Sequence, residues 1–96
     1  MSEKISFYNT AGLGMVDLLE AIEKAKTQDE RVKLIFRTKN RPMGASEVWM
    51  IYKTWFKNCP LTSIRRSIST LRWHGIVKPT GEMTTGAYGR AERMWR

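Results

Sequence analysis

The sequence predicts a mainly helical α+β domain that ends in a two-stranded β-hairpin. Four segments repeat apolar residues at intervals of three and four, as one face of an α-helix does. Stretches with Pro or Gly separate the second, third and fourth segments from one another, and the chain after residue 75 alternates strand-forming residues with turns. The 96 residues, 42% of them hydrophobic, suffice for one core but not for two independent ones. We therefore predict a single domain over residues 1–96.

The N-terminal part is expected to form an arm and two helices. Residues 1–14 hold Gly and Asn without a sustained period, so we expect a flexible arm with a short strand at Ile5–Tyr8. The apolar spacing from residue 15 onward predicts an accessory helix over 15–26. Thr27 precedes Glu30 by three residues, which is the spacing of a capping box and predicts a second helix over 28–39.

A third helix is expected after the break at residues 40–44, which contains Pro and Gly. Ser46 is the expected N-cap of this helix, and Glu47 suits its first turn. One face repeats apolar residues at helical spacing and is expected to enter the core. These residues are Val48, Ile51, Tyr52 and Trp55.

A fourth helix is expected over residues 61–74, with Pro60 suited to its first position because proline lacks the amide proton that would be unpaired there. Gly75 is expected to end this helix in a Schellman motif. A narrow apolar stripe predicts its buried face. The stripe consists of Leu61, Ile64, Ile68 and Leu71.

The C-terminal segment predicts the hairpin. Ile76–Lys78 has the character of a first strand, and Pro79–Glu82 of a turn region. The segment Ala87–Arg96 is then expected to contain the return strand.

Positive charge is concentrated in the second half of the chain. The whole chain has a formal net charge of +8. Residues 1–48 carry eight bases and seven acids, whereas residues 49–96 carry nine bases and two acids, a net charge of +7. Six of these nine bases are Arg, whose planar guanidinium matches phosphate oxygens and guanine edges. This asymmetry favours a polyanion, above all nucleic acid, as the partner.

The outward face of the predicted helix 61–74 carries only Arg, Ser, Thr and Trp. No acidic residue occurs between Glu47 and Glu82. Guanidinium and hydroxyl groups without a nearby carboxylate suit the major groove of DNA, where Arg binds guanine and Ser or Thr binds phosphates or base edges. An ordinary surface helix would mix charges of both signs.

Four stretches carry a resemblance to a known family. Ala45–Val48 opens one helix, Pro60–Leu71 forms the next, Gly75–Val77 follows it, and Tyr88–Arg96 ends the chain. Together they resemble the winged helix-turn-helix of DNA-binding domains, especially of small bacterial and phage regulators. The resemblance covers residues 28–96, the winged-helix core, and leaves helix 15–26 as an addition to it.

The resemblance implies that helix 61–74 enters the major groove and that the wing, residues 76–96, contacts the adjacent backbone or minor groove. The family's contact positions on the helix correspond to Thr62, Ser63, Arg65, Arg66, Ser69 and Arg72. On the wing, Lys78, Thr84, Thr85 and Arg90 are expected at the tip, and Arg93 on the return strand. The implied function is double-stranded DNA binding, specific or general, in regulating transcription or replication.

A rival interpretation is a winged-helix module that binds a protein, such as a phage product that captures a host protein. Helix 15–26 either packs on the core or forms a homodimer or protein contact. Trp49 and Phe56 lie off the predicted core face, where they are either half-buried by the wing or arm or free for a partner. RNA binding is a third, weaker alternative, because the helix offers one outward Trp and no aromatic platform.

No catalytic or metal site is expected. Cys59 and His74 are fifteen residues apart with no acid between them to orient the imidazole. The single His and single Cys exclude a zinc finger and an internal disulfide, and no phosphate-binding glycine loop occurs. We therefore expect a non-enzyme without cofactor or small-molecule substrate. No signal-like or membrane-spanning stretch is apparent, so we expect a cytoplasmic protein of a bacterium or phage-infected cell.

Overall fold

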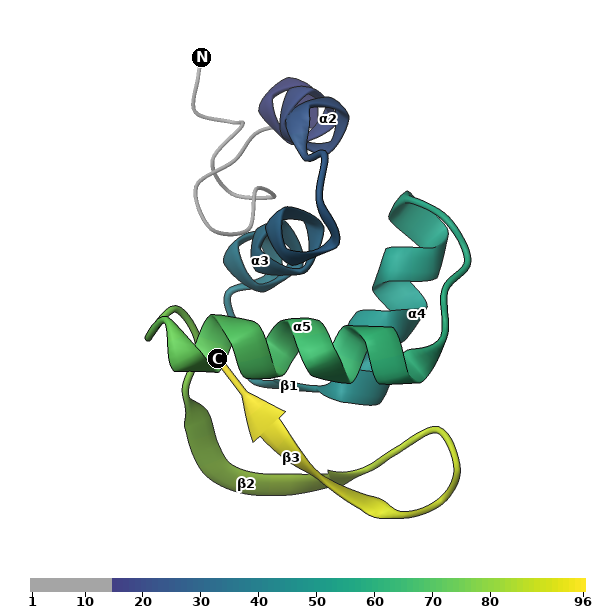
Figure 1. Ribbon diagram of the computed structural model, residues 1–96, viewed down its shortest axis with the longest axis vertical. Helices are drawn as coiled ribbons and strands as arrows, with labels where there is room; N and C mark the ends of the chain where they lie inside the picture. Colours follow the sequence, from purple (N-terminus) through teal and green to yellow (C-terminus); the bar gives the residue numbers. More distant parts are fainter. Residues whose placement is uncertain (1–14) are drawn as a thin grey trace.

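The computed structural model describes residues 15–96, which form an α+β fold with the helices on one side of a small sheet (Figure 1). The predicted arm and the strand at Ile5–Tyr8 lie outside the described residues. Helix α5 runs across the molecule, with α3 on one side and the sheet on the other (Figure 1). In chain order, the elements are α2 (Met15–Lys24), α3 (Gln28–Lys39), β1 (Met43–Gly44), α4 (Ala45–Trp55), α5 (Leu61–Trp73), β2 (Pro79–Thr85) and β3 (Ala91–Trp95).

The helices predicted at 15–26 and 28–39 are confirmed, although α2 ends two residues earlier, at Lys24. The capping box at the start of α3 is also confirmed. The Glu30 amide donates to Thr27 Oγ1 over 3.1 Å, and Glu30 Oε1 accepts from the Thr27 amide at 3.1 Å and the Lys26 amide at 2.8 Å. These backbone donors stabilise the carboxylate, so the pKa of Glu30 lies below its ordinary value.

The start of α4 differs from the prediction. Gly44, not Ser46, is the N-cap, and it makes no side-chain capping bond. Ser46 lies inside the first turn and is buried, with its side chain engaged by the hairpin. The prediction was wrong because Ser46 satisfies a distant part of the chain and not its own helix end.

Helix α5 follows the prediction closely. It begins at Leu61, with Pro60 as the N-cap and not as the first helical residue. All four residues of the predicted stripe are buried. At the C-terminal end, Gly75 has a φ of 75°, its amide donates to Arg72 O, and the Ile76 amide donates to Leu71 O, both at 2.9 Å. These two bonds are those of a Schellman motif.

The core lies between α3, α4 and α5. The largest fully buried side chains include Tyr52, Ile35, Met43 and Ile64. Residues 16–24 of α2 contribute no buried side chain to this cluster, since Val16 and Leu19 are exposed and Ala25, just after the helix, is buried separately. Helix α2 packs against α3 and does not enlarge this core cluster.

The sheet contains a short strand, β1, within residues 40–44, where the sequence predicts a break between two helices. Strand β1 pairs with β3 in an antiparallel register, Met43 opposite Trp95, and the strand order is β1-β3-β2. The hairpin is also displaced along the chain. Strand β2 begins at Pro79, within the predicted turn, and a bulge between Pro79 and Met83 accommodates Gly81 with its φ of 88°.

Candidate nucleic-acid interface

Helix α5 presents the side chains that its sequence placed outward. Five positions of α5 are buried, Leu61, Ile64, Ser67, Ile68 and Leu71, and the others point away from the core. Ser63 and Thr70 lie at the margin and are half-buried. The exposed residues are Thr62, Arg65, Arg66, Ser69, Arg72 and Trp73.

A groove separates α5 from the β2–β3 hairpin. It consists of three adjoining hollows. The middle hollow shares Arg65 with the hollow at the hairpin turn, and it shares Ser69 and Trp95 with the hollow at the C-terminal end of α5. The groove therefore runs along α5 from the hairpin turn towards the C-terminal end of the helix. We call it the helix–hairpin groove. Its basic residues are Arg65 and Arg72 on α5 and Arg90 and Arg93 on the hairpin.

Glu92 fixes the hairpin against the helices. Its side chain is only 12% exposed, and it accepts from the Ser46 amide at 2.8 Å and the Ser46 hydroxyl at 3.0 Å. Ser46 Oγ in turn accepts from the Ala87 amide at 2.7 Å. Arg65 Nη2 lies 3.9 Å from Glu92. A Cβ atom at Gly44 would lie 2.6 Å from Glu92 Oε1, so the carboxylate fits only beside glycine there.

Sequence analysis did not identify Glu92 as part of this interface. Glu92 is the only acid in the return segment Ala87–Arg96, and this lone acid among basic residues is the one feature of the sequence that could have indicated its role. Its partner Ser46 is 46 positions away, so local pattern gives no indication of the contact. The groove on the hairpin side of α5 therefore contains one carboxylate that the helix sequence alone does not reveal.

The hairpin residues are arranged differently from the prediction. The turn lies at residues 86–90, where the Gly86 amide donates to Arg90 O over 2.7 Å and Gly89 has a φ of 78°. Arg90 is therefore at the turn, as expected. Lys78 is at the opposite end, because its backbone pairs with that of Arg96 at 3.0 and 3.2 Å, and the prediction that it lies at the tip was wrong.

The remaining hairpin positions lie along the strands. Thr84 is half-buried opposite Glu92, and Thr85 is exposed opposite Ala91, so both precede the turn instead of forming it. Arg93 is exposed on β3 and lines the groove. The structure thus brings Arg90 and Arg93 to the groove with Arg65, and leaves Lys78 apart from them.

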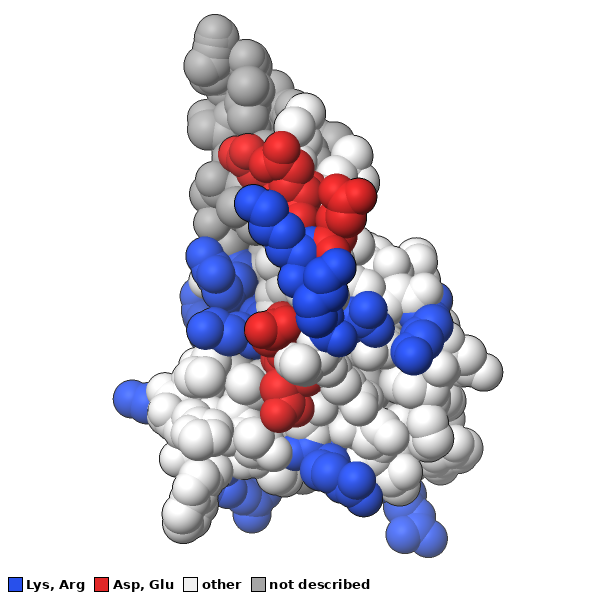
Figure 2. Space-filling view, turned by 45° about the horizontal axis from the view of Figure 1, so that its top comes forward, with Lys and Arg blue, Asp and Glu red and all other residues white. Residues whose placement is uncertain are grey.

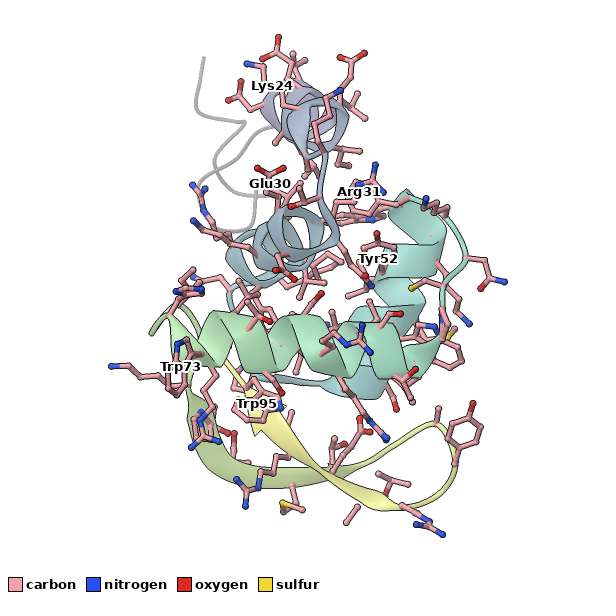
Figure 3. The ribbon with its side chains drawn as sticks, in the orientation of Figure 1. Lys24, Glu30, Arg31, Tyr52, Trp73 and Trp95 are labelled. Atoms are coloured by element: carbon pink, nitrogen blue, oxygen red, sulfur yellow. The ribbon has the colours of Figure 1, made fainter. Side chains whose placement is uncertain are left out.

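Trp49 and Phe56, which the helical spacing places off the core face, are half-buried and pack against the core cluster. The Trp49 indole donates to Cys59 O over 2.7 Å, and Lys53 Nζ lies 3.6 Å from its ring centroid. The Arg31 guanidinium lies 4.8 Å from the Phe56 ring centroid and donates to the Tyr52 hydroxyl (Figure 3). These intramolecular contacts occupy part of the surface that a protein partner would need.

Cys59 lies partly against the core, and His74 lies at the end of α5. Cys59 is half-buried, and burial raises the pKa of its thiol. His74 is the C-cap of α5, and its amide donates to Thr70 O over 3.1 Å. Across residues 15–96, no three His, Cys, Asp or Glu side chains are grouped so as to hold a metal.

Charge is distributed unevenly over the molecule. Figure 2 shows acidic side chains in the upper and middle parts and only Lys and Arg among the charged side chains along the lower edge. The acids of α2, which include Asp17, lie at the upper end, whereas α5 contains none. The hairpin contains two, Glu82 and Glu92. The α5 side of the molecule is therefore the more favourable one for an anionic ligand.

No family model, curated protein or solved structure matches this chain. Within residues 15–96, no helix has both the length and the apolar character needed to cross a membrane.

Proposed function

We propose that this chain is a winged-helix protein that binds double-stranded DNA and regulates transcription or replication by occupying a site. In this proposal α5 lies in the major groove, and the β2–β3 hairpin contacts the adjacent backbone or minor groove. The hairpin that directly follows α5, and the pair α4 and α5 joined by a short connection, support the winged-helix part of the proposal.

The observation that carries the proposal is the solvent face of α5. Arg66 and Thr62 are exposed on the side away from the helix–hairpin groove, and Arg65, Ser69 and Arg72 are exposed along it. No acid occurs in this helix. Guanidinium groups form paired hydrogen bonds with guanine O6 and N7, and hydroxyl groups bind phosphates or base edges.

The dimensions of α5 also suit the major groove. Its 13 residues correspond to a length of about 20 Å at about 1.5 Å per residue. A helix with its side chains is about 10–12 Å across, close to the width of the major groove, about 12 Å. The helix is exposed along one whole side, so a duplex can approach it without rearrangement of the core.

The first test is fluorescence anisotropy of the purified protein with random duplex DNA of about 20 base pairs, double-stranded RNA and single-stranded DNA, from about 50 to about 300 mM salt. The proposal expects the tightest binding to duplex DNA, with the logarithm of the affinity falling linearly with the logarithm of salt concentration. Weak binding to all three at low salt would refute it.

Arginine variants then test the docking geometry. With a selected binding site, we expect Arg66→Ala and Arg65→Ala each to weaken specific binding by about 1–3 kcal/mol. Arg90→Ala is expected to weaken binding evenly across sequences and to reduce the salt slope by about one. Arg37→Ala is the matched control, because Arg37 is exposed on α3 and lines a different hollow, beside α2. Full binding by the Arg65→Ala/Arg66→Ala double variant would contradict this geometry.

A further inference from the structure

Trp73 is the most exposed large apolar side chain in residues 16–96, with 87% of its surface accessible. Tryptophan is normally well buried, because its indole ring is large and largely apolar. Trp73 lies at the C-terminal end of α5, where neither the helix nor the Schellman motif requires an aromatic ring. The packing of the domain therefore gives no reason for this side chain.

A second indole lies close to the same surface. Trp95, from β3, is half-buried against the core, and Figure 3 shows both rings on the side of α5 that faces the hairpin. Together with Ser69 and Arg72, the two tryptophans line an open hollow of about 450 Å³, within the range of about 300–1,000 Å³ typical of small-ligand sites. The Arg72 guanidinium lies 5.5 Å from the Trp95 ring centroid.

The lining of this hollow has a specific chemical character. Its lining consists of two indole rings, a planar guanidinium and the Ser69 hydroxyl group, and no acid is among the lining residues. Such a set suits a flat aromatic ring attached to an anion. A nucleobase with its phosphate meets both requirements, but a base inside a duplex has both faces covered by its neighbours.

We propose that the Trp73–Trp95 hollow binds an unpaired nucleobase next to the duplex held by α5. This inference rests on the proposed DNA-binding function and adds a preference for DNA with an unpaired base, at a single-stranded tail or a bulge. Trp73 stacks on the base, Trp95 forms the opposite wall, and Arg72 binds the adjoining phosphate. This hollow is the end of the helix–hairpin groove nearest the C-terminus of α5 and shares Ser69 and Trp95 with the next hollow, so one strand can follow the groove into it.

The test compares three labelled duplexes of the same sequence by fluorescence anisotropy. One is blunt, one carries a single-stranded tail of about five nucleotides, and one carries a single-base bulge. We expect the wild-type protein to bind the tailed or the bulged duplex roughly five- to a hundredfold more tightly than the blunt one. The arm that gains affinity identifies the source of the unpaired base.

Variants of Trp73 test whether the preference for an unpaired base depends on this hollow. Trp73→Ala is expected to abolish the preference, measured as the ratio of affinities for the tailed or bulged duplex and the blunt one, while leaving the circular dichroism spectrum unchanged, because the side chain is exposed. Trp73→Phe is expected to keep most of the preference, since it retains an aromatic face. Tyr88→Ala is the matched control, because Tyr88 is 73% exposed at the hairpin turn, on the other end of the groove.

The results distinguish failure of the unpaired-base site from failure of the proposed DNA binding. Equal affinity for all three duplexes, with salt-dependent binding intact, would overturn the inference and leave the proposed function standing. Persistence of the preference in Trp73→Ala, or its equal loss in Tyr88→Ala, would overturn the assignment to this hollow. Absence of binding to every duplex would refute the proposed function itself.

Discussion

Replacement of Glu92 by Gln is expected to lower stability and raise DNA affinity at the same time. The substitution keeps the size of the side chain and removes its charge. In the structure the carboxylate is nearly buried, accepts two hydrogen bonds from Ser46 at the start of α4, and lies 3.9 Å from Arg65. The same charge borders the groove that is proposed to receive DNA phosphates, where it opposes binding.

The magnitude of the stability loss follows from these contacts. Two hydrogen bonds to a charged acceptor become bonds to a neutral one, at a cost of about 1 kcal/mol in all. Loss of a negative charge at a helix N-terminus adds about 0.3–1 kcal/mol. The ion pair with the half-exposed Arg65 adds less than about 1 kcal/mol. We expect Glu92→Gln to lower the free energy of unfolding by about 2 kcal/mol, out of about 5–15 kcal/mol typical of a domain.

The gain in affinity is smaller. A unit charge about 6 Å from a phosphate contributes ~0.7 kcal/mol in water, which corresponds to a change of about threefold in the dissociation constant. Glu82→Gln is the matched control, because it removes the same charge from an exposed position on β2 of the same hairpin. Its effect on stability is expected to stay within about 0.5 kcal/mol.

Urea unfolding followed by circular dichroism measures the stability, and anisotropy with duplex DNA measures the affinity. The reasoning about Glu92 would be refuted if Glu92→Gln were as stable as the wild-type protein. It would also be refuted if Glu92→Gln weakened DNA binding while Glu82→Gln did not.

Two further predictions concern the helix ends. Gly75→Ala places a Cβ in open space but at a φ of 75°, so we expect a loss of about 1 kcal/mol from backbone strain alone and a melting temperature about 4–8 °C lower; an unchanged melting temperature would contradict the Schellman assignment. The lowered pKa of Glu30 means that its carboxylate stabilises the fold above its unfolded pKa, near 4.5, and that this contribution is lost as pH falls through the lower folded pKa. The stability difference between wild type and Glu30→Gln, measured by urea unfolding, should therefore be constant near neutral pH and shrink below about pH 4.5; a difference that grows on acidification would have the wrong sign.

The helices could be predicted from the sequence because their determinants are local. The capping box of α3 needs only Thr27 and Glu30, three positions apart, and the end of α5 needs a residue that tolerates positive φ, which Gly75 provides. The buried stripe of α5 follows from the helical repeat, since residues three and four apart share a face. The exposed arginines of α5 follow from the same repeat.

The sheet could not be predicted in this way. Strand β1 has two residues, and its identity depends on pairing with β3, with Met43 opposite Trp95. No periodic pattern fits into two positions, and the Pro and Gly of residues 40–44 indicate a break by local preference. Strand β2 tolerates Pro79 and Gly81 because a bulge and a positive φ absorb them, whereas by local preference both residues indicate a turn.

The sequence by itself determined four helices, the buried face of α5 and a basic second half, because these properties depend on residues close together in the chain. Tertiary structure decided which of the basic residues line the helix–hairpin groove together. It moved Lys78 away from the turn, set Glu92 against Ser46 and Arg65, and brought Trp95 beside Trp73. Strand pairing and side-chain contacts across dozens of residues fix these juxtapositions, and only the folded chain brings such positions together.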